Sequence, residues 1–381
     1  MSSHLRIRRD IAAMSAYTPT TSLEVFAQRL GLSADRLIKL DANENPFGPS
    51  PRVHEALAQL AGAHIYPDPE SGRLRALLAD YCGAPAEQIL CGAGADELIE
   101  LILQLFIEPG DCIINTPPTF AMYSFDAPLY HARVIDVPRR ADFSLDVEAI
   151  EQAVQRHSPK LVFLCSPNNP SGNIIPSAQF ERLLALPTML ALDEAYIEFA
   201  EADSLASQVG ARKNLIVLRT LSKWAGLAGL RLGYGIFPPA LMPHLWKIKQ
   251  PYNVNVAADV AGQASLEDSD LLHDRIAELK RQRQRLESAL AQLPFLHPYP
   301  SQANFVLCRV VGLPASQLRD RLAQAGIIVR YYDKPRLRDH IRISAGTAPQ
   351  IDRLLTALIR IADQSAPPSP GPLSPPRGKR S

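Results

Sequence analysis

One lysine lies in the sequence pattern most typical of covalent chemistry. Lys223 follows an apolar run that predicts a strand over Ile216–Arg219, and hydroxyl side chains precede it at Thr220 and Ser222. A lysine amine can form a Schiff base with an aldehyde cofactor when its surroundings lower its pKa. The two hydroxyls, together with Arg231 further along, would suit a phosphate group on that cofactor. A surface charge is the common alternative, but few surface loops have this composition.

A carboxylate occupies the equivalent place after a second predicted strand. Asp193 follows the apolar run Met189–Leu192, at the carboxyl end where parallel sheets bind their ligands. Burying a carboxylate is costly unless a cation pairs with it. A protonated pyridine nitrogen would be such a partner, and the pairing would make the ring an electron sink. Tyr196, three residues further on, could reach the same ring.

Two more polar segments follow predicted strands. Residues 166–172 read SPNNPSG, which taken alone is most simply a turn. Gly92–Glu97 is a glycine-rich turn before a predicted helix, and its free backbone N–H groups suit a phosphate. It lacks the third glycine of the dinucleotide pattern G-x-G-x-x-G, so a single phosphate fits better than a pyrophosphate.

These segments resemble motifs of the fold type I, or aspartate-aminotransferase-like, family of pyridoxal-phosphate enzymes. The match runs in order from about Leu40 to Ile361. More narrowly, the chain resembles the histidinol-phosphate aminotransferases, although related enzymes share most of the motifs. The segments that carry the resemblance are LDANENPFGP (40–49), YPD (66–68), GAGADE (92–97), SPNNPSG (166–172), LDEAY (192–196), LSKWAGLAGLRLG (221–233), NVNV (253–256), QANF (302–305) and IRISAG (341–346).

The resemblance implies a set of residues that hold pyridoxal 5'-phosphate. Lys223 would bind the cofactor covalently, and Asp193 would bond its pyridinium nitrogen. Asn169 and Tyr196 would bond its phenolic oxygen. Phe120 would stack on the ring, at a position where the family often has tyrosine. The residues implied to hold the phosphate are Gly94, Ala95, Asp96, Thr220, Ser222 and Arg231.

The resemblance also implies a shared active site and two substrate-binding arginines. Tyr66 would reach the cofactor phosphate of a neighbouring subunit, which implies an obligate homodimer. Arg342 would bind a substrate carboxylate, including that of glutamate. Arg330 would bind the phosphate of histidinol phosphate, with Lys334 and Arg336 as possible helpers. A basic surface of strands and loop is the alternative for this region.

The part of the pocket that would receive the imidazole ring is less sharply defined. Tyr17 lies where the family places an aromatic residue, but Thr18 and Pro19 follow it instead of the usual Pro-Gly. A packing role for Tyr17 is therefore an equal alternative. Glu44 and Asn45 either line the same pocket or cap a turn.

The function implied is amino transfer between histidinol phosphate and 2-oxoglutarate in histidine biosynthesis. The chain would work as a ping-pong enzyme in which the freed amine of Lys223 moves the proton. Two enzyme alternatives of the same fold are an aromatic-amino-acid aminotransferase and a threonine-phosphate decarboxylase. A pyridoxal-phosphate-binding regulator is disfavoured, because only about 40 mostly non-basic residues precede the matched region.

This chemistry needs parallel strands whose carboxyl ends share one edge of a sheet. From about residue 50 to 240, short apolar runs alternate with helical patterns, which predicts an α/β fold with a mainly parallel sheet between helices. The resemblance implies that this sheet is seven-stranded. The predicted strands are 88–91, 111–115, 161–165, 190–192 and 216–219, and the predicted helices between them are 73–81, 96–106, 147–157 and 178–184.

A smaller α/β unit follows a predicted connecting helix over 275–293. Its predicted strands are 305–309, 327–330 and 340–344, and its predicted helices are 316–325 and 349–362. The expected division is an N-terminal arm (1–45), a large cofactor-binding domain (46–274), a small domain (275–364) and a tail (365–381). The tail is rich in proline and is predicted to be disordered.

Composition excludes several other classes of function. The 381 residues contain 40 Lys and Arg against 39 Asp and Glu, a balance that argues against a nucleic-acid binder. No apolar run approaches the ~18 residues of a membrane span. The five cysteines form no CxxC pair and the histidines are dispersed, which argues against disulfides and a metal site. The N-terminus lacks a signal-peptide pattern, so the cytoplasm is the expected location.

Overall fold

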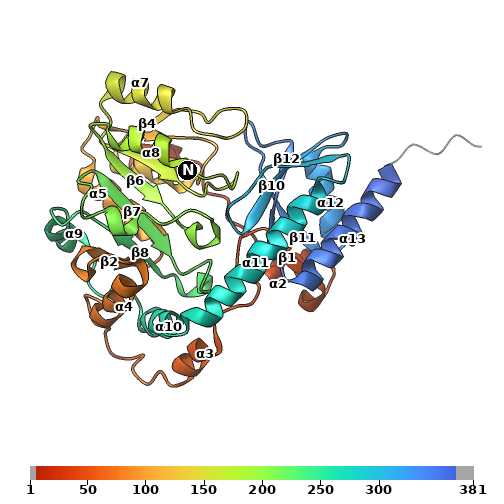
Figure 1. The fold of residues 1–381 in the computed structure, drawn as a ribbon, viewed down its shortest axis with the longest axis horizontal. Coiled ribbons are helices and arrows are strands. Elements are labelled where there is room, and N and C mark those ends of the chain that lie inside the picture. The colour runs from red at the N-terminus through yellow and green to blue at the C-terminus, as the bar shows by residue number, and fades with distance from the viewer. Residues whose placement is uncertain (1–5, 366–381) are drawn as a thin grey trace, which may run out of the picture.

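The chain builds two β-sheets that lie side by side and share one long helix (Figure 1). The computed structural model describes residues 6–365. The segment predicted to be a disordered tail therefore falls, apart from its first residue, outside the described part of the chain.

The larger sheet has seven strands, and most of them are parallel. Its strand order is β2-β8-β7-β6-β5-β3-β4, with β8 antiparallel to both of its neighbours. The fold class predicted from the sequence is therefore confirmed. The strands are β2 (Ile89–Gly92), β3 (Cys112–Asn115), β4 (Arg133–Asp136), β5 (Leu161–Cys165), β6 (Met189–Asp193), β7 (Leu215–Thr220) and β8 (Gly233–Ile236).

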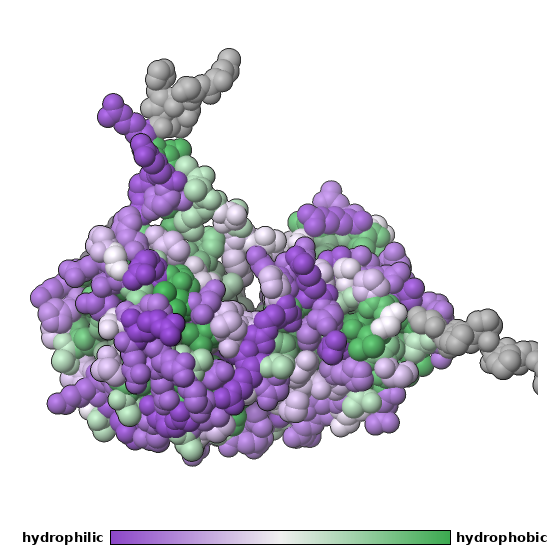
Figure 2. Space-filling model, turned by 90° about the horizontal axis from the view of Figure 1, so that it is seen from above, coloured by the Kyte–Doolittle hydropathy of each residue, from purple (hydrophilic) through white to green (hydrophobic). Residues whose placement is uncertain are grey.

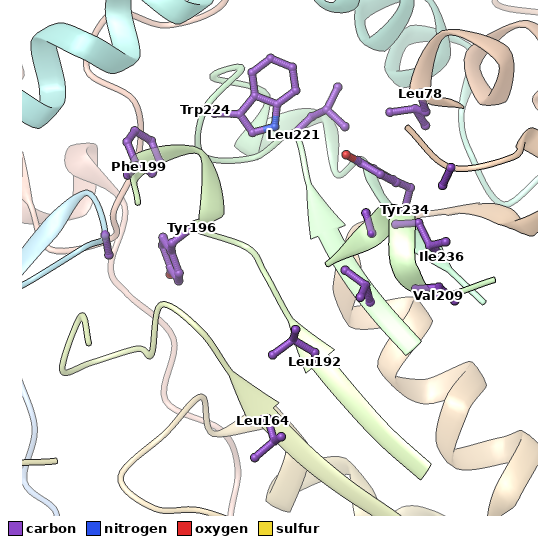
Figure 3. Packing of buried hydrophobic residues seen from close by; sticks show 14 of the residues in the cluster. Leu78, Leu164, Leu192, Tyr196, Phe199, Val209, Leu221, Trp224, Tyr234 and Ile236 are labelled. Carbon is purple, nitrogen blue, oxygen red and sulfur yellow. The ribbon is translucent and has the colours of Figure 1, made fainter. Parts of the chain in front are cut away.

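The central strands are apolar along their whole length because both faces of the sheet are covered. On one face, Leu164, Leu192, Val217 and Ile236 form a row of register partners within one core (Figure 3). Residues one position away on these strands, such as Phe163, belong to a second core on the opposite face. This alternation follows from the two-residue repeat of a strand.

Helices cover each face of the large sheet. Helices α4, α7, α8 and α10 pack on the face that contains Leu192, and α5, α6 and α9 pack on the other. Side chains cap several helix starts, as when Asp146 accepts a hydrogen bond from the N–H of Ala149 at 3.2 Å. The helices of this part are α3 (Pro51–Ala58), α4 (Gly72–Cys82), α5 (Ala95–Phe106), α6 (Met122–Asp126), α7 (Val147–His157), α8 (Ser177–Leu184), α9 (Met242–Ile248) and α10 (Val256–Leu266).

The smaller sheet has five strands in the order β1-β11-β12-β10-β9. Its first strand comes from the N-terminal part of the chain and pairs in parallel with β11. Helices α12 and α13 pack against the core of this sheet. The elements are β1 (Ile38–Leu40), β9 (Leu296–Pro298), β10 (Phe305–Val310), α12 (Ala315–Gln324), β11 (Ile327–Tyr331), β12 (His340–Ser344) and α13 (Ala348–Ser365).

Helix α11 (Ser269–Leu290) joins the two sheets by packing into both cores (Figure 1). Leu272, Ile276 and Leu279 lie in the core of the large sheet, whereas Leu286 and Leu290 lie in the core of the small one. The domain boundary expected at residue 274 falls inside this continuous helix. The helix also begins earlier than the sequence pattern indicated, because a polar stretch at 267–270 hides its first turn.

Two short helices precede β1, namely α1 (Arg9–Ala13) and α2 (Leu23–Leu30). Figure 2 shows the arm before α2 standing out from the body of the molecule. Among the described residues, no helix is both long and apolar enough to cross a membrane.

Candidate active site

The polar segments that follow β5, β6 and β7 meet at one edge of the large sheet. The register pairs Cys165 with Asp193, so the last residues of β5 and β6 lie next to each other. The N–H of Ser166 donates to the carbonyl of Asp193 at 3.0 Å. β7 ends at Thr220, and Lys223 follows three residues later. Parallel strands therefore bring together side chains that are far apart in the sequence.

Asp193 is a buried carboxylate with two hydrogen-bond donors. Its Oδ2 accepts from the hydroxyl of Tyr123 at 2.5 Å, and its Oδ1 accepts from the N–H of Ala195 at 2.9 Å. Burial nevertheless raises the pKa of Asp193 to about 6. A cation placed against this carboxylate would favour its charged form, which is the role that a pyridinium nitrogen would have.

Lys223 is partly buried, and its Nζ donates to the carbonyl of Ala42 at 3.1 Å. Burial, followed by the positive charge of Arg342, lowers the pKa of Lys223 to about 8. The next residue, Trp224, is fully buried and stacks on Tyr81 with ring centroids 4.8 Å apart (Figure 3). This anchor fixes the backbone that carries the lysine.

A cradle for one phosphate lies at the start of α5. Gly94 is the N-cap residue with φ of 83°, and Arg231 Nη2 donates to Asp96 Oδ2 at 2.6 Å beside it. The φ of Gly94 is one that favours glycine, and a Cβ atom there would also lie 2.6 Å from Arg231 Nη2, which would have to shift. At the end of β7, Thr220 Oγ1 accepts from the N–H of Ser222 at 3.1 Å. These groups fit a phosphate, because they combine a helix N-terminus with a cation and hydroxyls.

The cradle is fastened by residues that the sequence did not single out. Glu97 Oε2 accepts from the N–H of Ala93 at 2.6 Å and from Asn253 Nδ2 at 2.8 Å. Asn253 also donates to the carbonyl of Cys91 at 3.1 Å. One carboxylate therefore ties the glycine turn to the segment before α10. The motif NVNV, which begins at Asn253, was the sequence feature that could have identified this contact.

A hydrogen-bonded group links the large sheet to the small one. The hydroxyl of Tyr196 accepts from Asn43 Nδ2 at 3.1 Å and from Asn169 Nδ2 at 3.4 Å. Asn169 Oδ1 accepts from Arg342 Nη1 at 2.5 Å, and Arg342 Nη2 donates to the carbonyl of Asp41 at 2.6 Å. Burial raises the pKa of the Tyr196 hydroxyl. All of these side chains were predicted from the sequence except Asn43, which lies in the motif LDANENPFGP.

Aromatic rings flank Asp193 on the side of α6. Phe120 packs edge-on against Tyr123 with ring centroids 5.6 Å apart. Tyr123 is fully buried and stacks on Phe163 at 5.0 Å. Tyr123 was not predicted from the sequence, although it lies three residues after Phe120.

The outer candidate residues lie away from this group or are held by local contacts. Asn45 Nδ2 donates to the carbonyl of Trp224 at 2.9 Å and its Oδ1 accepts from the N–H of Phe47, which favours the turn-capping alternative. Glu44 is paired with Lys39 at 2.6 Å. Arg336 donates to the carbonyls of Arg140 at 2.6 Å and Pro117 at 3.5 Å, so its guanidinium is not free to assist a phosphate site.

Tyr17 and Tyr66 lie outside this hydrogen-bonded group, whereas Arg330 is the register partner of Arg342 within it. Tyr17 packs edge-on against Phe125 at 5.9 Å, and Arg330 Nη2 donates to the carbonyl of Thr18 at 3.4 Å. Tyr66 is 78% exposed and stacks on Tyr252 at 4.5 Å, with Ile65 also exposed beside it. Within the described residues, no cluster of His, Cys, Asp or Glu could hold a metal ion.

Together, the fold and the residues at this edge of the large sheet indicate the class of protein. Residues 35–358 match the family model for aminotransferase class I and II, and the chain belongs to that family. The family, and one solved relative described below, imply pyridoxal phosphate as the cofactor. A buried carboxylate, a partly buried lysine and a glycine cradle beside Arg231 form a set of residues that fits this group.

Particular relatives are similar over nearly the whole chain. The chain is 54% identical to the histidinol-phosphate aminotransferase of Roseiflexus castenholzii, over 93% of this chain and 98% of that protein. It is 48% identical to the chloroplastic histidinol-phosphate aminotransferase 1 of Arabidopsis thaliana, over 92% and 85%. Its fold is similar to that of histidinol-phosphate aminotransferase from Sinorhizobium meliloti in complex with pyridoxal-5'-phosphate. That comparison has a TM-score of 0.86 and 31% identity, and covers 96% of this chain and all of the other.

Proposed function

We propose that the protein is a pyridoxal-phosphate-dependent aminotransferase that moves an amino group between L-histidinol phosphate and 2-oxoglutarate. The observation that carries the chemistry is that Asp193 ends β6 and Lys223 follows the end of the adjacent strand β7, with the pKa of the lysine lowered and that of the carboxylate raised. The choice of substrate is supported by relatives at 54% and 48% identity that bear this enzyme's name.

In this proposal each part of the cofactor meets a group suited to it. Asp193 would bond the ring nitrogen and keep it protonated. Tyr196 and Asn169 would bond the phenolic oxygen, and Phe120 would cover the ring. The groups proposed for the phosphate are Gly94, Ala95, Asp96, Thr220, Ser222 and Arg231. When bound, pyridoxal phosphate supplies an electron sink for the substrate carbon that loses a proton.

Lys223 and Arg342 would act on the substrates. The Lys223 Nζ would bind the cofactor covalently and, once displaced by the substrate amine, would accept the proton from the amine-bearing carbon. Arg342 offers a guanidinium fork that would bind the carboxylates of 2-oxoglutarate and glutamate in place of its present partners. Its buried Nε has no hydrogen-bond partner among the described residues, which leaves one donor for such a ligand.

Arg330 and Tyr17 are proposed to define the other end of the pocket. Arg330 would bind the phosphate of histidinol phosphate, and Tyr17 would face the imidazole ring. Asn45 is retained as a weaker candidate, because its amide is already bonded to the backbone. The cytoplasmic location expected from the sequence stays a prediction.

A homodimer with shared active sites is also proposed. The support is the exposed aromatic pair of Tyr66 and Tyr252, since large exposed apolar side chains beside a binding site suit an interface. Tyr66 of one subunit would reach the cofactor phosphate of the other.

A donor survey tests the proposal. The purified protein would be supplied with 2-oxoglutarate and with histidinol phosphate, phenylalanine or threonine phosphate. We expect glutamate to form fastest from histidinol phosphate, with kcat/KM at least about tenfold above that for phenylalanine. Release of carbon dioxide from threonine phosphate without glutamate would replace the proposal with a decarboxylase.

Substitution of Lys223 tests its proposed role in the chemistry. Lys223→Ala should abolish turnover and the visible absorbance of the bound cofactor. Lys213→Ala, which removes an exposed lysine, is the matched control and should leave both unchanged. Transamination by Lys223→Ala at the wild-type rate would refute the assignment.

A further inference from the structure

The two proposed substrate arginines are direct neighbours across the small sheet. In the antiparallel pair formed by β11 and β12, Arg330 is the register partner of Arg342. Like charges directly opposite each other on two strands destabilise the pairing. Something must offset this repulsion if both guanidinium groups are to stay in place.

The ring of Tyr332 lies against both guanidinium groups. The Cζ of Arg330 lies 5.3 Å from the ring centroid, and the Cζ of Arg342 lies 5.8 Å from the same centroid. Both distances are within the ~6 Å range of a cation–π interaction. One aromatic ring therefore contacts two cations that would otherwise only repel each other.

We propose that Tyr332 is a positioning residue that fixes Arg330 and Arg342 for binding of two anionic substrates. This inference rests on the proposed function, which assigns those arginines to a substrate phosphate and a substrate carboxylate. Arg342 has a second aromatic contact, with Phe305 at 5.1 Å, whereas Tyr332 is the aromatic contact that both arginines share. The loss of its ring should therefore affect both substrates.

Tyr332 packs near Phe143, which belongs to the part of the molecule that contains the large sheet. It packs on a small core made of Phe143, Leu307 and Leu337. Phe143 is 2% exposed and comes from the loop after β4, and it meets Tyr299 of the small unit at 4.9 Å. This contact ties the arginine-bearing strands to the part of the molecule that carries Lys223.

Arg336 fastens the same contact from the small unit. Its Nη2 donates to the carbonyl of Arg140 at 2.6 Å, and its Cζ lies 5.7 Å from the ring of Phe143. Through Arg336, the loop between β11 and β12 is thus fixed to the loop after β4. Tyr332 follows β11 directly, so it transmits this fixed position to the arginines.

The test compares two variants of Tyr332 in the holoenzyme. Tyr332→Leu removes the π face and keeps much of the bulk, whereas Tyr332→Phe keeps the ring and removes the hydroxyl. We expect Tyr332→Leu to raise KM for histidinol phosphate and for 2-oxoglutarate by roughly 5- to 10-fold, which corresponds to the loss of a cation–π contact. Its kcat should stay within about twofold of wild type, and Tyr332→Phe should match wild type in both constants.

Two further measurements separate this role from a structural one. The cofactor dissociation constant, followed by absorbance, should be almost unchanged in Tyr332→Leu, because the cofactor residues lie on the large sheet. In an Arg330→Gln background, Tyr332→Leu should no longer raise KM for histidinol phosphate. Wild-type KM values in Tyr332→Leu, or equal defects in the Leu and Phe variants, would overturn the inference.

The glutamate half-reaction keeps the inference distinct from the proposed function. That half-reaction uses a carboxylate donor and does not depend on histidinol phosphate. A raised KM for glutamate in Tyr332→Leu, restored in Tyr332→Phe, would support the positioning role even if wild-type protein failed to use histidinol phosphate. Failure with histidinol phosphate alone would refute only the proposed substrate.

Discussion

At the scale of single residues, burial brings the pKa values of Lys223 and Asp193 closer together. The lysine falls to about 8 and the carboxylate rises to about 6, because each charged form loses solvation. The positive charge of Lys223 lowers the pKa of Asp193, so the two groups lie within electrostatic reach. A lysine that is partly neutral near neutral pH is a competent nucleophile, whereas an exposed lysine is almost fully protonated.

The capture of pyridoxal phosphate by apoenzyme should therefore depend on the charge of Lys223. Only the neutral amine attacks an aldehyde, so the capture rate should rise with pH through a midpoint near 8. Arg342→Gln removes a positive charge that lowers this pKa, and the midpoint should move upward, toward the ordinary lysine value. Stopped-flow absorbance between pH 6.5 and about 9.5 measures the midpoint.

Arg330→Gln is the matched control for this measurement. It removes the same charge from the adjacent strand and should leave the midpoint near that of wild type. A midpoint that stays the same in Arg342→Gln would show that Arg342 does not set the pKa of Lys223.

At the scale of elements, the strand β7 carries a buried ion pair directly before the site. Arg219 Nη2 lies 2.7 Å from Glu198 Oε1, and both side chains are 5% exposed. The guanidinium also lies over the rings of Tyr81 at 5.3 Å and Tyr234 at 5.7 Å. Thr220 follows Arg219, so this pair helps to fix the end of the strand from which the lysine loop begins.

Removing the cation should leave an unpaired buried carboxylate. Arg219→Met is expected to lower the free energy of unfolding by about 3–5 kcal/mol at pH 8, as measured by denaturant unfolding. Burial already raises the pKa of Glu198, and the loss of Arg219 would raise it further. The destabilisation is greatest at a pH where Glu198 is ionised in the unfolded chain. It should shrink as the pH falls toward 4.5, the pKa of the glutamate in the unfolded chain, because the buried carboxylate then becomes neutral.

Two comparisons make this expectation specific. Arg212→Met removes an arginine from a solvent-accessible pair with Glu181 and should change stability little. Arg219→Met combined with Glu198→Met should recover part of the loss, because the unpaired charge is then absent. An Arg219→Met variant as stable as Arg212→Met would contradict this account of the pair.

Sequence patterns located the elements with strong apolar runs and missed those without them. The buried strands β5 and β7 were predicted within one residue at each end. β4 was missed because it is an edge strand with a partly exposed pattern, and β8 was missed because its sequence GYGI reads as a turn.

The same limit applies to the candidate site. Lys223 and Asp193 were found because each has a local signature after a strand. Tyr123 and Asn43 were missed because their partners, Asp193 and Tyr196, lie 70 and 153 residues away in the sequence. Such contacts depend on strand order and on how the two sheets meet, which the local pattern does not contain.

At the scale of the whole molecule, the two sheets contribute different parts of the candidate site. The large sheet carries Lys223 and Asp193, whereas the small sheet carries Arg330 and Arg342. Helix α11 packs into both cores, Phe143 enters the small unit, and Arg342 donates to Asn169, so several contacts hold the parts together. The exposed pair of Tyr66 and Tyr252 adds a third part, which the proposed dimer would place against another subunit.

Intersubunit complementation tests that arrangement directly. If Tyr66 serves the neighbouring subunit, a heterodimer of Lys223→Ala with Tyr66→Ala contains one intact site, because the intact lysine and the intact tyrosine meet there. Coexpression should then give about a quarter of the wild-type activity, since half of randomly paired dimers are mixed and each has one good site. Lys223→Ala mixed with Arg231→Ala is the control, because both residues belong to one subunit's site and no intact site can form. Equal activity in the two mixtures would place Tyr66 in its own subunit's site, whereas about half of the wild-type activity would place Tyr66 outside any site.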